Sequence, residues 1–140
     1  MPASLRHRPV RPLKAAALLA LTLGLTACVT GPRFANLDAR VVADEPMTLP
    51  PDAELNVRLE EADSQDDLIA EASYIRLGSG PIPVTLRYDA KAIDEDSEYV
   101  LRAEIRGEDG LLYATPEPVP VLTGEAPQAD VTLPVERIDR

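Results

Sequence analysis

The sequence is short of the residues that most enzyme sites and metal sites use. Its 140 residues include one cysteine, one histidine and no tryptophan. The histidine is His7 and the cysteine is Cys28, so an intramolecular disulfide is impossible. After Cys28 the chain lacks the residues of a Ser-His-Asp triad, a cysteine nucleophile or a zinc site of the usual His and Cys kind. We therefore expect no catalytic residue, no metal and no cofactor.

Basic residues are also scarce, and they are unevenly placed. Arg6, Arg8, Arg11 and Lys14 lie in the first 14 residues, which contain no acidic residue. The rest of the chain holds all 24 acidic residues against 10 basic ones, a formal net charge of −14. Nucleic-acid binding depends on Lys and Arg displacing counterions, so this charge argues against nucleic acid as a partner.

The one long apolar run follows the basic segment directly. Residues 15–25 are almost wholly apolar, and small residues come just before Cys28. A basic segment, a short apolar run and small residues at a cleavage site are typical of a secretory signal peptide. The run is too short to span a bilayer, which takes about 20 residues. The pattern predicts a signal peptide over residues 1–27.

The segment Leu25-Thr26-Ala27-Cys28 resembles the lipobox of bacterial lipoprotein signal peptides. The resemblance implies that Cys28 receives a diacylglyceryl group, that cleavage precedes it, and that its new amine is acylated, with palmitate as the expected kind of chain. The alternative is an ordinary secretory signal with a chance cysteine. Two or three acyl chains hold a small domain durably on a membrane. Val29 replaces the Asp that usually marks inner-membrane retention, so we predict anchoring to the outer membrane of a Gram-negative bacterium, facing the periplasm.

Hydrophobic alternation predicts strands in the rest of the chain, because a sheet with one buried face has a period of two residues. The clearest segments are 53–60, 82–88, 97–106 and 131–135. Residues 62–67 are polar and acidic, which predicts a loop. Residues 68–77 fit a helix or a strand, and Ile69, Tyr74 and Ile75 favour the strand.

Turn residues set the connections between these strands. Asp109-Gly110 predicts a hairpin with a type I′ turn, which leads into a return strand over residues 111–115. Prolines at 46, 50 and 51 allow residues 47–49 to form at most a short edge strand, and Pro134 predicts that the last strand is an edge. A short helical turn is expected near residues 90–93.

These elements predict an all-β fold, an immunoglobulin-like antiparallel β-sandwich of about seven short strands after a signal-peptide helix and a tether. The expected organisation is a signal peptide at 1–27, a lipidated N-terminus and tether at 28–44, and a sandwich domain at 45–140. A first strand near Arg40-Val41-Val42 is an alternative reading of the tether.

Several predicted strands carry a pattern similar to the YscW-like lipoprotein domain, also called the YbaY-like family. The matching segments are 49–60, 82–89, 93–94, 99–105, 110–113 and 119–123. Ala114 and Pro116 stand where the family pattern has an aromatic residue and an Asp. The resemblance implies a lipid-anchored β-sandwich. Some members resemble pilotins, small lipoproteins that escort secretins to the outer membrane, so it implies an envelope partner of the secretin kind and no catalytic residue.

Two other function classes remain open from the residues alone. Carboxylates cluster at Asp94-Glu95-Asp96 with Glu98, and at Asp63 with Asp66-Asp67. They could serve a carbohydrate-binding module or a carboxylate-dependent hydrolase, although neither cluster has the glycine of a calcium loop and solvated turns explain both. Strand edges near Met47 and Val131 could instead accept a partner strand. A passive structural lipoprotein is the third reading.

Overall fold

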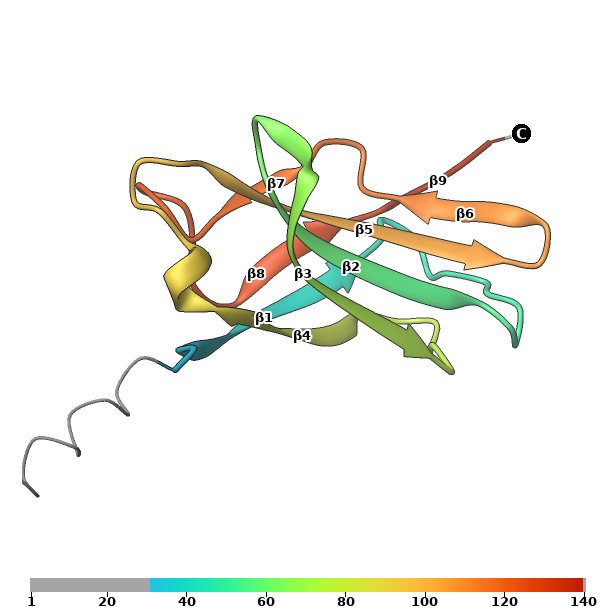
Figure 1. Ribbon diagram of the computed structural model, residues 1–140. Helices are drawn as coiled ribbons and strands as arrows, with labels where there is room; N and C mark the ends of the chain where they lie inside the picture. Colours follow the sequence, from blue (N-terminus) through green and yellow to red (C-terminus); the bar gives the residue numbers. More distant parts are fainter. Residues whose placement is uncertain (1–30, 140) are drawn as a thin grey trace, which may run out of the picture. The chain divides into compact units, whose positions relative to one another are not determined.

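Alternating apolar and polar side chains build two β-sheets that pack face to face (Figure 1). The computed structural model describes residues 31–139, and Pro32–Arg140 form one compact unit. The described elements are β1 Phe34–Val42, β2 Glu54–Glu61, β3 Ser64–Ile75, β4 Ile82–Asp89, the 3-10 turn η2 Ala90–Ala92, β5 Tyr99–Gly107, β6 Gly110–Ala114, β7 Val119–Val121, β8 Val131–Pro134 and β9 Glu136–Arg137.

One sheet has the strand order β4-β1-β8, and the other has the order β3-β2-β5-β6-β9 with β7 also paired to β5. Neighbouring strands are antiparallel, except that β8 runs parallel to β1. The predicted all-β sandwich is confirmed. The parallel pair was not predicted, because it joins β1 to β8, which lie far apart in the sequence. No turn motif between neighbouring segments indicates such a pairing.

The core lies between the two sheets and is almost entirely aliphatic. In β2, β4, β5 and β8 the buried residues follow the predicted two-residue alternation, except that Glu60 is also buried and Tyr88 is only half-buried. The largest fully buried side chains come from both sheets: Leu37, Leu55, Leu59, Leu86, Leu101, Ile105 and Leu133. Removing this apolar surface from water supplies the main driving force for folding, about 25 cal/mol per Å².

The stretch predicted as a tether, residues 28–44, needs correction over residues 34–42. These residues form β1, which pairs with β4 on one side and β8 on the other. Leu37, Ala39 and Val41 point into the core. The segment looked mixed in polarity because only three of its side chains are buried. The sandwich therefore begins near Phe34 and not at residue 45.

Two local predictions also differ from the structure. The acidic loop expected over 62–67 is shorter, because β3 begins at Ser64 and its pairing with β2 carries a register shift at Glu60. The hairpin after β5 is confirmed, but Gly110 already pairs with Gly107, so Glu108 and Asp109 are the central turn residues, and neither has a positive φ. A type I′ turn needs positive φ at both central residues, so the predicted turn type is wrong.

Residues 47–49, which the prolines limited to a short edge strand at most, are irregular in the structure. The Met47 N–H donates to the carbonyl oxygen of Ser79 at 3.1 Å, and the Met47 side chain is buried. The ambiguous segment 68–77 is mostly strand, as favoured, and β8 is an edge strand, as predicted.

Candidate functional site

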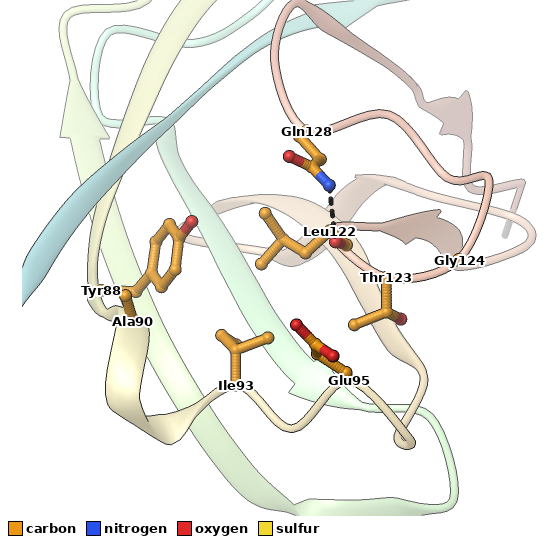
Figure 2. A pocket seen from close by; sticks show the side chains of 8 residues that line it. All are labelled: Tyr88, Ala90, Ile93, Glu95, Leu122, Thr123, Gly124 and Gln128. Carbon is orange, nitrogen blue, oxygen red and sulfur yellow. Dashed lines mark hydrogen bonds between the residues drawn. The ribbon is translucent and has the colours of Figure 1, made fainter.

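A pocket of about 450 Å³ opens at one end of the sandwich, between the turn after β4 and the loop after β7 (Figure 2). The side chains of Tyr88, Ile93 and Leu122 point toward one another and form its apolar floor. The remaining lining residues are Ala90, Glu95, Thr123, Gly124 and Gln128. Tyr88 ends the alternating segment 82–88, and its half-buried side chain packs against the core.

The wall after β7 is held in a costly backbone conformation. Leu122 has φ 71°, a left-handed value that a branched side chain seldom adopts. The Leu122 N–H donates to the carbonyl oxygen of Pro127 at 3.0 Å, and its own carbonyl accepts from Gln128 Nε2 at 3.3 Å. Strain of this kind costs about 1–3 kcal/mol and is common at binding sites. In this conformation the Leu122 side chain packs in the core, where it is 8% exposed, and also lines the pocket.

The opposite wall is fixed by hydrogen bonds of two side chains. The Asp89 carboxylate accepts the Lys91 N–H at 3.0 Å and so caps η2. The buried Tyr99 hydroxyl accepts the Asp94 N–H at 2.8 Å and donates to the carbonyl oxygen of Ala92 at 3.3 Å. Because Tyr99 belongs to the core, these bonds tie the loop 90–98 to the rigid part of the fold.

A second pocket, of about 400 Å³, adjoins the first and shares Glu95, Thr123 and Gly124 with it. Its walls add Asp96, Glu98 and Glu125. These three carboxylates and that of Glu95 are all exposed to water. A glycosidase acid needs a site that keeps it protonated, usually by burial. The two pockets together offer an apolar floor inside an acidic rim, which suits binding of an apolar group beside a cation.

Sequence reasoning missed a cluster on the outer face of the larger sheet. Glu60 is buried, with its side chain 3% exposed, although it lies on the strand face opposite the core. Its carboxylate meets Arg58 Nε at 3.3 Å and Arg102 Nε at 3.9 Å, and the two arginines face each other across β2 and β5. The carboxylate neutralises a pair of like charges that would otherwise repel. The alternation of polar residues in β2 and β5 could have indicated that Arg58 and Arg102 share a face of the sheet, but not that Glu60 is buried between them.

The free edge of β4 is covered by a side chain. The Tyr74 hydroxyl donates to the carbonyl oxygen of Thr85 at 2.9 Å and accepts the Thr85 N–H at 2.8 Å, so it takes the place of a neighbouring strand. Pro83, on the same strand, has no N–H to offer. Protected edges of this kind argue against strand addition at β4.

The sequence-predicted site residues divide into two groups. Leu25, Thr26, Ala27 and Cys28 lie outside the described residues. Asp63, Asp66, Asp67 and the cluster 94–98 lie on exposed segments. Within residues 31–139, no group of three or more His, Cys, Asp or Glu side chains is placed to hold a metal ion. In the same range, helices long and apolar enough to cross a membrane are lacking.

Two comparisons with known proteins give a match. The family model described as "Type III secretion system lipoprotein chaperone (YscW)" matches residues 33–133. The solved structure of an alternative pilotin from the type II secretion system of Vibrio cholerae has a TM-score of 0.65 and 24% identity, over 75% of this chain and 99% of that one. That likeness shows a shared fold. No curated protein sequence matches the chain.

Proposed function

The chain belongs to the YscW family of type III secretion system lipoprotein chaperones, and we propose that it is a non-catalytic lipoprotein that binds and escorts another cell-envelope protein. The partner suggested by its pilotin-like relatives is a secretin. Both the family match and the pocket with an acidic rim support binding rather than catalysis.

The anchor belongs to the same proposal. Cleavage before Cys28 and acylation of that residue would attach the domain to the outer membrane, on its periplasmic side. Five residues, 29–33, separate Cys28 from the first residue of β1. Even fully extended, such a connection reaches about 20 Å. A partner bound to the sandwich would therefore stay close to the lipid surface, as escort to a membrane requires.

The pocket is the observation that carries the binding proposal. Its floor of Tyr88, Ile93 and Leu122 can accept an apolar side chain, and its rim carries the exposed Glu95. The adjoining pocket adds the exposed carboxylates of Asp96, Glu98 and Glu125. The partner segment that fits would present an apolar residue flanked by Lys or Arg. A strained Leu122 supports this reading, because the fold keeps a conformation that costs stability at that one wall.

Affinity purification from detergent-solubilised envelope tests the binding role. The test variant is Glu95→Lys combined with Glu125→Lys, both exposed at the rim. The matched control is Glu54→Lys combined with Glu108→Lys, which makes the same change of charge at exposed positions outside the two pockets. We expect the unmodified protein and the control to recover one envelope protein that the rim variant loses at least tenfold. Recovery of nothing above background by any form would refute a partner, and equal recovery by all three would refute the pocket.

The anchor is tested separately by the intact mass of the membrane-extracted protein beside Cys28→Ser. We expect a mass equal to residues 28–140 plus acyl chains, and loss of that mass in the variant. An uncleaved precursor or an unacylated mature chain would show that Cys28 is not an anchor.

A further inference from the structure

We propose that the outward-facing side chains at the start of β1 and the end of β4 bind the surface of a lipid bilayer that contains anionic headgroups. The inference rests on the proposed lipid anchor at Cys28 and adds a second, non-covalent contact with the membrane. The residues that carry it are Phe34, Arg33 and Arg87, which are all exposed.

Phe34 is the single phenylalanine of the chain, and 54% of its surface is exposed to solvent. In β1 the residues that face the core are Leu37, Ala39 and Val41, which are buried. Phe34 lies on the opposite face, so packing in the core does not explain why this position is apolar. The Arg87 guanidinium lies 4.2 Å from the centre of the Phe34 ring. An exposed aromatic ring beneath a cation is the combination that partitions to the boundary between headgroups and acyl chains.

The strands around Phe34 are much less acidic than the domain as a whole. Residues 28–140 carry a formal net charge of −14, whereas Arg33, Arg40 and Arg87 in these segments are accompanied only by Asp38 and Asp89, and the Arg87 guanidinium lies over the ring. The neighbouring carboxylate, on Asp89, accepts the backbone N–H groups of Arg33 at 3.2 Å and of Lys91 at 3.0 Å. These bonds turn it toward the backbone. These segments hold one more basic than acidic residue, so this end complements anionic headgroups better than the acidic remainder of the domain does.

The length of the connection places this cluster near the bilayer. β1 begins at Phe34, six residues after Cys28, and six extended residues reach about 20 Å. A tethered surface meets the membrane at a high effective concentration, so a contact of one aromatic ring and two arginines suffices to bias orientation. The Ala90 N–H donates to the carbonyl oxygen of Arg33 at 2.7 Å, which fixes η2 to the same end.

This contact would also orient the pocket. Phe34 and Arg87 lie on the outer face of the β4-β1-β8 sheet, whereas Tyr88, the next residue of β4, faces the pocket. Binding of the outer face to lipid therefore leaves the pocket open at the end of the sandwich, beside the membrane and not against it. A partner segment would be received at the level of the lipid surface.

The absence of tryptophan from the chain allows a direct test with single-tryptophan variants. Phe34→Trp places the probe in the cluster. Ile75→Trp is the matched control, because Ile75 is 68% exposed and lies at the far end of β3 (Figure 1). The membrane-extracted, acylated proteins are reconstituted into vesicles of phosphatidylethanolamine and phosphatidylglycerol, with and without brominated acyl chains. Intact mass is recorded for each preparation.

We expect brominated lipid to quench the F34W emission at least twofold and the I75W emission little, and the F34W quenching to fall when Arg87→Glu is added. Acylated protein with equal quenching at both positions would overturn the membrane contact and leave the anchor proposal intact. Equal quenching of F34W with and without Arg87→Glu would overturn the role of the arginine in binding headgroups. An unacylated mass would overturn the anchor and this inference together.

Discussion

Replacing Glu60 by Gln tests the cluster on the outer face of the larger sheet. The substitution keeps the size of the side chain and removes the charge that lies between Arg58 and Arg102. At the observed distances of 3.3 and 3.9 Å, each ion pair attracts with roughly 4–5 kcal/mol if the effective dielectric constant is about 20. Burial of the carboxylate offsets most of this attraction, since its desolvation is costly.

The arginine side chains are 41% and 31% exposed, so water screens both pairs further. We therefore expect Glu60→Gln to destabilise the protein by about 2 kcal/mol, between the values of exposed and of fully buried pairs. For a domain of this size the loss lowers Tm by about 8 °C. The loss includes the repulsion between two arginines that face each other across β2 and β5.

Urea unfolding at low and high salt is the assay, and Glu104→Gln is the control. Glu104 pairs with Arg106 at 2.9 Å on the same sheet, with side chains 31% and 60% exposed, so its loss should cost about 0.5 kcal/mol or less. At about 1 M salt the screening length falls to roughly 3 Å. The unmodified protein then loses attraction while E60Q loses repulsion, and the gap between them should narrow. A gap that equals the control, or one that salt leaves unchanged, would refute the reasoning.

Two further predictions concern the edge of β4 and the loops. Tyr74→Phe removes the hydroxyl that binds both the N–H and the carbonyl of Thr85, so we expect the free energy of unfolding to fall by about 1–2 kcal/mol. The edge of β4 would then be open, and analytical ultracentrifugation should show more self-association. A variant that is as stable and as monodisperse as the unmodified protein would contradict the role of Tyr74 in covering this edge. Gly124→Ala should lower the free energy of unfolding by about 1 kcal/mol from backbone strain alone, because Gly124 has φ 63° and an added Cβ meets no atom within 4 Å. Arg76→Gly should raise it by about 0.5–1 kcal/mol, because the exposed Arg76 has φ 57°. Thermal unfolding that ranks the two variants in the opposite order would contradict this reasoning.

The fold class could be predicted from the sequence because burial of one sheet face imposes a local, two-residue period. Leu55, Val57 and Leu59 show it in β2, and Leu101, Ala103 and Ile105 show it in β5. Such a pattern survives without knowledge of the partner strand. The hairpin between β5 and β6 was found for the same reason, since Asp109 lies in the turn and Gly110 follows it directly as the first residue of β6.

The pocket could not be predicted in this way. Its walls come from two loops, 90–98 and 122–128, that are separated in sequence and meet only in the folded chain. The residue type at position 122 does not predict a positive φ, because leucine normally avoids that conformation. The burial of Glu60 could not be predicted either, because Glu60 lies at a register shift in the β2–β3 pairing and no residue type indicates such a shift.

The sequence by itself determined which residues face inward, where most turns fall, and the family to which residues 33–133 belong. Each of these depends on residue type and short spacing. Only the tertiary structure decided that residues 34–42 form a central strand, that β8 pairs with it in parallel, and that Phe34 and Arg87 meet on one face. Those outcomes depend on contacts between segments about 50 to 100 residues apart, and the free energy of such contacts is set by the folded partner and not by the segment alone.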